Sequence, residues 1–352
     1  MNTSESMVAL TIFFALFLSP LSVVLSSAEF FQFLKSPYGP NAFAFNSAGE
    51  LYAAVEDGRI VKYKGSSNHG FSTHAVASPF WNRKVCENYT ELQLKPFCGR
   101  TYDLGFHYET QQLYIADCYY GLGVVGPEGG RATQVARSAD GVDFKWLYAL
   151  AVDQQTGFVY LTDVSIKYDD RGVQDILRIN DTTGRLIKYD PSTNEARVLM
   201  NGLNVPGGTE VSKDGSFLVV AEFLSHRILK YWLKGPKANT SEVLLKVRGP
   251  GNIKRTKAGE FWVASSDNNG ITVTPRAIKF DDFGNILQVV PVPPPYKGEH
   301  FEQAQEHNGS LYIGTLFHDF VGILHNYEGS SDPKENNVDG VDGSLNGVAS
   351  SV

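Results

Sequence analysis

A repeated strand pattern constrains the fold of this chain more than any other feature of its sequence. Six times a turn signal leads into an apolar strand with an aromatic residue, at 49–55, 111–117, 157–163, 215–223, 259–265 and 309–315. A second strand of similar composition follows each of them, at 58–63, 121–126, 184–190, 226–232, 275–281 and 321–327. The pairs recur at intervals of about 50 residues, a spacing typical of the blades of a β-propeller.

Ahead of each pair lies a further short apolar segment that can form the innermost strand of a blade. A single blade cannot bury both of its faces, so neighbouring blades must pack face to face. The repeats therefore predict an all-β chain folded as a six-bladed β-propeller with short helical insertions. The leading segment 29–36 is then expected to complete the last blade and to close the ring.

Two insertions interrupt the repeats. One of them, residues 80–99, contains two of the three cysteines. The other, residues 168–180, predicts a short helix whose apolar residues share one face. These apolar residues are Val173, Ile176 and Leu177.

The two ends of the chain differ from the repeats in composition. Residues 7–27 are apolar, are interrupted by Pro20 and end in small residues, which predicts a secretory signal peptide over residues 1–28. An uncleaved membrane anchor is the alternative. The propeller domain is expected over residues 29–328. The tail 329–352 is rich in Gly, Ser, Asp and Asn, a composition that predicts disorder.

A secretory route sets expectations for the cysteines and for glycosylation. In an oxidising compartment the simplest count for three cysteines is one disulfide and one thiol. Cys86 and Cys98 enclose a short loop and are predicted to pair, whereas Cys118 lies in a strand and is expected to be a buried thiol. Four sequons for N-glycosylation fit the same route, at Asn88, Asn180, Asn239 and Asn308.

Charge and motif spacing exclude several classes of function. The net charge of −7 and the absence of a dense Lys/Arg run argue against binding to nucleic acid. Residues 121–126, "GLGVVG", match G-x-G-x-x-G, but a turn follows them where a nucleotide site needs a helix. His307, His318 and His325 do not have the spacing of metal ligands, so no metal site is predicted.

The innermost strands of a propeller line its central channel, and functional residues gather where those strands begin. The segment 298–307, which starts "GEHFEQ", is predicted to be the innermost strand of the sixth blade. Residues two apart on a strand point to the same side, so His300 and Glu302 are expected to face the channel together.

The other strand starts offer aromatic and apolar side chains with few carboxylates. They include Tyr102, Trp146, Tyr148 and Val205. A single glutamate among aromatic rings suits a flat organic amine rather than a hard cation, which needs six or more oxygen ligands. Desolvation should raise the pKa of Glu302 towards the range that suits a general base.

Several longer runs of the sequence indicate a family, among them "CGRTYD", "FKWLYA", "VPGGTE" and "YKGEHFEQ". With these runs the chain resembles the plant strictosidine synthase family from about residue 35 to residue 327. The resemblance implies a six-bladed propeller that joins tryptamine to the aldehyde of secologanin in a Pictet–Spengler condensation. It also implies a vacuolar enzyme that uses no metal or organic cofactor, and we expect it to act as a monomer that is free of the membrane once its signal is cleaved.

The resemblance also implies roles for individual residues. Glu302 matches the catalytic general base, and His300 matches a residue that contacts the glucose of secologanin. Tyr102 and Phe223 match the pair that encloses the indole ring. Further pocket positions fall on Trp146, Tyr148, Val173, Leu177, Val205, Ser266, Leu316 and Phe317. The segment 267–275 is shorter than in relatives, which leaves the rim on the secologanin side unassigned.

Two other classes of function remain open from the sequence. A metal-dependent lactonase or esterase of similar architecture would need polar ligands at several strand starts, and bound calcium would identify it. Its candidate ligands are Asn41, Asn204, Asn252 and Asp267. A non-catalytic member of the same plant family should lack the glutamate of "GEHFEQ", which is present here as Glu302.

Overall fold

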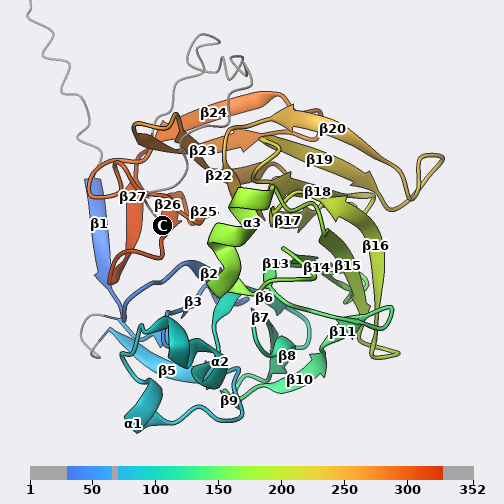
Figure 1. Cartoon of the computed structure of the whole chain (residues 1–352). Coiled ribbons are helices and arrows are strands. Elements are labelled where there is room, and N and C mark those ends of the chain that lie inside the picture. The colour runs from blue at the N-terminus through green and yellow to red at the C-terminus, as the bar shows by residue number, and fades with distance from the viewer. Residues whose placement is uncertain (1–29, 66–69, 328–352) are drawn as a thin grey trace, which may run out of the picture.

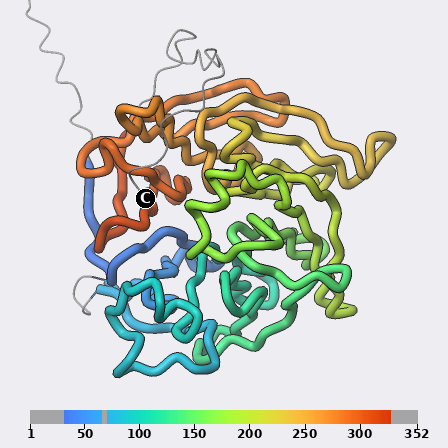
Figure 2. The backbone as a smooth tube through the Cα atoms, in the orientation of Figure 1, coloured from blue at the N-terminus to red at the C-terminus, as the bar shows by residue number. Residues whose placement is uncertain are grey.

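The computed structural model describes residues 30–65 and 70–327. In this part of the chain six antiparallel sheets surround a common centre, each forming one blade (Figure 1). The chain passes once around the ring, from blue to red, and returns to its starting point (Figure 2). The predicted six-bladed β-propeller is therefore confirmed. The expected signal peptide at 1–28 and the expected disordered tail at 329–352 lie outside the described residues.

Each blade runs from an innermost strand to an outermost strand. The innermost strands are β2 (Ala42–Phe45), β6 (Thr101–His107), β13 (Leu147–Val152), β17 (Pro206–Val211), β21 (Pro250–Arg255) and β25 (Gln303–His307). The second strands are β3 (Leu51–Ala54), β7 (Gln112–Asp117), β14 (Val159–Asp163), β18 (Phe217–Glu222), β22 (Phe261–Asn268) and β26 (Ser310–Gly314). The third strands are β4 (Arg59–Tyr63), β8 (Gly121–Val125), β15 (Gly184–Asp190), β19 (Arg227–Trp232), β23 (Val273–Phe280) and β27 (Phe320–His325).

The outermost strands carry weaker sequence signals. They are β5 (Phe71–Val76), β10 (Thr133–Ala136), β16 (Glu195–Leu203), β20 (Ser241–Lys246), β24 (Ile286–Pro291) and β1 (Phe30–Lys35). Short extra strands extend the surface between the second and third blades and beside the first: β9 (Gly130–Arg131), β11 (Ser138–Ala139) and β12 (Val142–Asp143). Most of these strands face solvent on one side, so they lack the continuous apolar runs that mark the inner strands.

The sixth blade closes the ring with strands from both ends of the propeller domain. Its outermost strand β1 pairs antiparallel with β27, in a register that sets Phe31 opposite Leu324 and Lys35 opposite Phe320. The prediction for the leading segment is confirmed. Closure of this kind leaves no open seam between the first and last blades.

The hydrophobic core is divided among the contacts between blades. Within the described residues six apolar clusters each combine side chains from two neighbouring blades. On β18, Val219 and Ala221 pack towards the fifth blade, whereas Leu218 and Val220 pack towards the third. This alternation follows from the two-residue period of a strand, and it explains why the inner strands are apolar on both sides.

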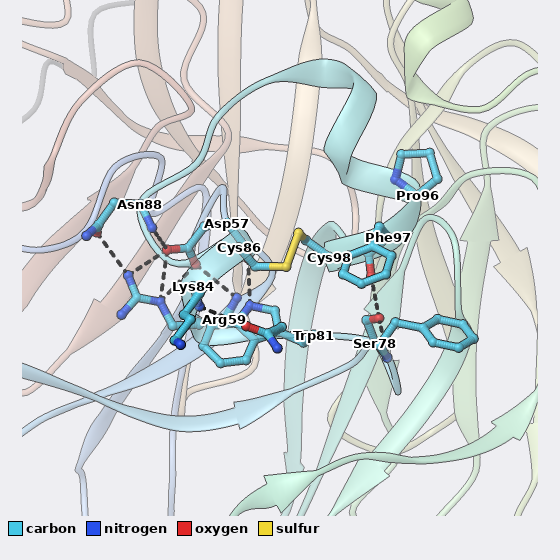
Figure 3. The surroundings of a disulfide bond; sticks show 12 residues. Asp57, Arg59, Ser78, Trp81, Lys84, Cys86, Asn88, Pro96, Phe97 and Cys98 are labelled. Carbon is cyan, nitrogen blue, oxygen red and sulfur yellow. Dashed lines mark hydrogen bonds and ion pairs between the residues drawn. A yellow bond between two sulfur atoms is a disulfide. The ribbon is translucent and has the colours of Figure 1, made fainter.

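The insertion at 80–99 folds into short helices that are held by a disulfide. These helices are α1 (Arg83–Cys86), η2 (Leu92–Leu94) and α2 (Lys95–Cys98). The Cys86–Cys98 disulfide is present, as predicted, and Cys118 is a buried thiol. Hydrogen bonds from Trp81 Nε1 to the Asp57 carbonyl (3.0 Å) and from Ser78 Oγ to the Phe97 carbonyl (2.6 Å) fasten the insertion to the first blade and to the chain beside it (Figure 3).

Peptide mapping without reduction is expected to recover Cys86 linked to Cys98, with Cys118 alkylated only after unfolding. Replacing both paired cysteines by serine should lower the free energy of unfolding by about 2–4 kcal/mol, because the crosslink limits the entropy of the unfolded chain. Chemical denaturation of the two forms measures that difference. A crosslinked peptide that contains Cys118 would refute the assignment.

The second insertion places a helix over the channel. It forms η3 (Asp170–Gly172) and α3 (Val173–Ile179), and α3 lies over the centre of the ring in the view of Figure 1. The Asp169 carboxylate accepts a hydrogen bond from Arg171 N at the start of η3. Ile176 is buried and its neighbours on the predicted apolar face, Val173 and Leu177, are half-buried, which confirms that face.

Two further properties concern the helices and the sequon asparagines. Within the ranges 30–65 and 70–327, no helix has the length and apolar character to cross a membrane. All four sequon asparagines are exposed and have positive φ angles, which asparagine tolerates better than most residues.

Candidate active site

The innermost strands begin, and the second strands end, at the same end of the ring. Pro206 pairs with Glu222, Pro250 with Ser265, and Gln303 with Gly314. The ladders shift register close to the starts of β6, β13, β17 and β21. Such irregularities turn side chains away from regular alternation, so the residues at this end point into a shared space.

An aromatic cluster occupies this end of the channel. It brings together the predicted residues Tyr102, Trp146, Tyr148, Val173 and Val205, with Cys118, Tyr119, Val164, Tyr168 and Ile176. These side chains come from the second, third and fourth blades and from α3. The structure therefore assembles in this cluster five of the eleven substrate-binding residues that the family resemblance implied.

Glu302 is bonded directly to this cluster. Its carboxylate accepts a hydrogen bond from the hydroxyl of Tyr148, a residue 154 positions away along the chain. Its backbone is held on both sides, because Glu302 N donates to the Gly314 carbonyl (2.9 Å) and Asn252 N donates to the Glu302 carbonyl (3.0 Å). The glutamate is thus fixed between the fifth and sixth blades.

The prediction that residues 298–307 form one innermost strand is wrong at its start. β25 begins at Gln303, and the preceding residues follow an irregular path in which Gly298 has a φ angle of 89°. Glu299 N donates to the Tyr296 carbonyl (3.1 Å) and Gly298 N donates to the Val273 carbonyl (3.1 Å), so turns precede the strand and its ladder begins only at Gln303. His300 and Glu302 therefore do not share a side through strand geometry, and tertiary contacts place each of them.

The side chains of Glu299, His300 and Glu302 have different partners in the structure. The ring of His300 lies 5.9 Å from that of Phe223, between ring centres. Glu299 Oε2 lies 2.9 Å from His318 Nε2, so Glu299 has a different partner from Glu302.

Two tyrosine rings form a stacked wall beside Glu302. The centres of Tyr102 and Tyr148 are 4.9 Å apart with an interplanar angle of 23°, and Trp146 lies 5.5 Å from Tyr102. Tyr102 is only 5% exposed, and the guanidinium of Arg100 lies over its ring at 4.8 Å. Tyr148 is half-buried and is the more open member of the stack.

The surroundings of Glu302 alter its protonation. Burial raises the pKa of this carboxyl, and the Tyr148 hydroxyl and the positive charge of Arg100 partly oppose that effect. Burial also raises the pKa of Tyr148 well above its ordinary value, so its hydroxyl remains a proton donor. A desolvated carboxylate with one hydrogen-bond donor is suited to accept a proton from a substrate.

Apart from Leu177 on α3, the remaining predicted residues lie on the fourth, fifth and sixth blades at the same end. Phe223 N donates to the Val205 carbonyl (3.0 Å), and Val205 has a φ angle of 53°, an unusual conformation for a β-branched residue. Ser266 Oγ accepts from Phe301 N at 3.2 Å. The half-buried Leu316 and Phe317 directly follow β26, and Leu177 lies on α3.

The asparagine candidates for a metal-dependent enzyme have protein partners for their amide nitrogens, whereas Asn41 Oδ1, Asn204 Oδ1 and Asp267 Oδ1 have no hydrogen-bond partner among the described residues. Asn41 Nδ2 donates to the Tyr102 carbonyl, Asn252 Nδ2 to Gln303 Oε1, and Asn204 Nδ2 to Asn180 Oδ1. Asp267 lies 3.8 Å from Arg248 and 3.6 Å from Arg276. In the part of the chain that the structure describes, no group of three or more His, Cys, Asp or Glu side chains could hold a metal ion.

An ion pair joins opposite sides of the channel. Lys254 Nζ on β21 lies 2.7 and 2.8 Å from the two carboxylate oxygens of Asp103 on β6. The same carboxylate accepts from Leu150 N on β13 at 2.9 Å. Both charged side chains are buried, so the pair links the second, third and fifth blades through the interior of the ring.

Sequence comparisons give consistent matches over most of the chain. A family model described as strictosidine synthase matches residues 148–236, and one described as strictosidine synthase-like, N-terminal, matches residues 24–63. The strictosidine synthase of Catharanthus roseus is 57% identical over 312 residues, which are 85% of this chain and 88% of that protein. Strictosidine synthase-like protein 12 of Arabidopsis thaliana is 41% identical over 322 residues, 90% of this chain and 96% of the relative.

Comparison with solved structures supports the architecture. A gluconolactonase from Xanthomonas campestris superposes with a TM-score of 0.60 at 14% sequence identity, over 85% of this chain and 89% of that one. At this identity the likeness shows a shared fold only.

Proposed function

The chain belongs to the strictosidine synthase family, and from this premise we propose that it condenses tryptamine with the aldehyde of secologanin to form strictosidine. The reaction is a stereoselective Pictet–Spengler condensation, and the enzyme falls in the carbon–nitrogen lyase class. The observation that carries the proposal is the half-buried Glu302 carboxylate, bonded to Tyr148 beside a stacked aromatic wall.

Glu302 acts as the general base in the proposed reaction. Tryptamine arrives as an ammonium ion, which must lose a proton before its nitrogen can attack the aldehyde carbon. The protonated Glu302 then returns this proton to the carbinolamine hydroxyl, which leaves as water and gives an iminium ion. The indole carbon closes the new ring, and that carbon loses its proton to restore the aromatic indole. Because the carboxylate is regenerated when water leaves, one carboxylate near both the amine and the indole can accept the two protons in turn.

The aromatic residues hold the indole in position. Phe223 supplies one face of the binding slot, and the Tyr102–Tyr148 stack supplies the other. Tyr102 forms the indole slot together with Phe223, and Arg100 over its ring and the stacked ring of Tyr148 support it. His300 contacts the glucose of secologanin, and Trp146, Val173, Leu177, Val205, Ser266, Leu316 and Phe317 line the remaining pocket.

Incubation of the purified protein with tryptamine and secologanin tests this function. Mass spectrometry should detect a product with the mass of both substrates less one water, and chromatography should show one stereoisomer. Heat-denatured protein serves as the control, because the two substrates can also condense slowly without an enzyme. Product formation no faster than in this control would reject the proposal.

Phe223→Ala is expected to weaken tryptamine binding by about 1–3 kcal/mol, because it removes one face of the indole slot. Secologanin binding should change far less. Calorimetric titration of each substrate measures the difference, and Phe283→Ala provides a control because Phe283 is 82% exposed. Equal losses for both substrates would show that Phe223 serves general packing.

The route to the site of action follows from the same proposal. A signal peptide at residues 1–28 directs the chain into the secretory pathway, its sequons receive glycans, and the mature monomer reaches the vacuole. Support comes from the disulfide and from the exposure of Asn88, Asn180, Asn239 and Asn308. Sequencing of the mature N-terminus, glycosidase treatment and imaging of a fluorescent fusion test the three steps.

A further inference from the structure

A cluster of buried charges lies behind the aromatic wall. Lys95 Nζ lies 2.8 Å from Glu56 Oε1 and 3.3 Å from Asp170 Oδ2. Arg100 Nη2 lies 2.8 Å from Glu56 Oε2. The four side chains are 0–14% exposed, and their two positive and two negative charges balance. We refer to these four residues as the charge cluster.

The charge cluster holds Tyr102 in two ways. The Tyr102 hydroxyl donates to Asp170 Oδ2 at 2.9 Å, and the Arg100 guanidinium lies over the Tyr102 ring. The hydroxyl of Tyr119 also donates to the Asp170 carboxylate. Hydrogen bonds to a buried carboxylate are stronger than those between neutral groups, so the position of Asp170 determines the position of both rings.

The members of the charge cluster come from separate insertions and loops. Lys95 begins α2 in the disulfide-bonded insertion, and Asp170 begins η3 in the insertion that carries α3. Glu56 follows β3, and Arg100 precedes β6. The Lys95–Asp170 contact therefore joins two insertions that are 75 residues apart in the sequence.

A continuous series of contacts leads from this cluster to the catalytic carboxylate. Lys95 contacts Asp170, Asp170 binds the Tyr102 hydroxyl, and Tyr102 stacks on Tyr148. Tyr148 in turn donates to Glu302. A stacked ring can slide or tilt at a small cost in free energy. The hydrogen bond from the Tyr102 hydroxyl to Asp170 therefore fixes the position of the Tyr102–Tyr148 stack.

We propose that Asp170 is a positioning residue for the condensation, which it serves by fixing Tyr102 and thereby Tyr148, and that Lys95 of the disulfide-bonded insertion holds Asp170 in place. This inference rests on the proposed function. It gives the two insertions a shared role. Neither insertion is a strand of a blade, and together they support the side of the pocket that binds the amine. The role is specific to one substrate, because His300, the residue assigned to secologanin, lies against Phe223 and outside this series of contacts.

Asp170→Asn is the direct test. The Tyr102 and Tyr119 hydroxyls bind different oxygens of Asp170, and asparagine keeps only one of these two atoms as an acceptor, while Lys95 keeps Glu56 as a partner. We expect the KM for tryptamine to rise about 10- to 100-fold, because this is the loss of affinity that corresponds to one hydrogen bond to a buried charged group. The KM for secologanin should stay within about threefold, which is the scale of a change with no lost contact.

The neighbouring carboxylate provides a matched control. Asp169 pairs with Arg171, whose side chain is 47% exposed, and an asparagine at position 169 can still accept the bond from Arg171 N. Asp169→Asn should therefore leave both KM values unchanged. If Asp170→Asn is folded by circular dichroism and both KM values match those of the wild type, the inference is wrong. Equal increases in both KM values would also overturn it, in favour of a general structural role.

Lys95 gives a second test if Asp170→Asn does not fold. Lys95→Met should raise the KM for tryptamine by about threefold to tenfold, and Lys95→Arg should restore it, because arginine can reach both carboxylates with one charge. A folded Lys95→Met enzyme with unchanged tryptamine KM would refute the proposal. If the wild-type protein forms no product, the proposed function and this inference are both rejected. If the wild-type protein is active and the variants have the same KM values as the wild type, only this inference is rejected.

Discussion

Glu302→Gln is expected to lower the rate of product formation about 10²- to 10⁴-fold while the propeller remains folded. Glutamine keeps the size of the side chain and can still accept the hydrogen bond from Tyr148, but it cannot take up the proton of the ammonium group. The affinity for tryptamine should fall much less than the rate, because the aromatic wall is unchanged. Single-turnover rates and calorimetric titration, with circular dichroism to confirm folding, separate the two effects.

Glu299→Gln is the matched control for this experiment. It makes the same chemical change three residues away, in the same irregular segment, at a side chain that pairs with His318 and not with Tyr148. Its rate should remain close to that of the wild type. A folded Glu302→Gln enzyme with near-normal turnover would assign Glu302 to a structural role.

The pH dependence of the rate provides independent evidence on the same group. Burial raises the pKa of Glu302, and the base is active only as the carboxylate. The rate should therefore rise with pH through a pKa above the ordinary range of glutamate, and this limb should be lost in Glu302→Gln. A rate that falls with pH over that range would contradict a carboxylate base.

Lys254→Met is expected to lower the free energy of unfolding by about 3–5 kcal/mol, the typical cost of leaving a buried ion without its partner. Lys254 makes two contacts of 2.7 and 2.8 Å with Asp103, and both side chains are buried. Without the ammonium group, the Asp103 carboxylate keeps hydrogen bonds from backbone amides only. Urea denaturation monitored by tryptophan fluorescence measures the loss.

Two further variants interpret that result. Lys257→Met removes an exposed lysine from the same region and should change stability by less than about 0.5 kcal/mol. The double variant Lys254→Met/Asp103→Asn should be more stable than Lys254→Met, since it removes the unpaired charge but keeps an acceptor for Leu150 N. If Lys254→Met were as stable as the wild type, the pair would contribute nothing to holding the blades together.

The sequence by itself determined the architecture of this protein. Strand alternation and turn signals are local, since they depend on neighbouring residues, and they recur six times with little change. The same local regularity predicted that β1 would close the sixth blade, and the short spacing of Cys86 and Cys98 predicted their disulfide. The resemblance of longer runs to a known family pointed to Glu302 and its neighbours.

Tertiary structure alone decided how the site is held. Strand alternation was the wrong guide at residues 298–302, because turns over residues 294–299 precede the strand and contacts with other blades place Glu302. The partners that matter are far apart in the sequence: 154 residues separate Tyr148 from Glu302, and 151 separate Asp103 from Lys254. Such pairs depend on where the closed ring brings each blade, and on the loss of water around their charges. Neither is a property of a local segment, so no sequence pattern marks them.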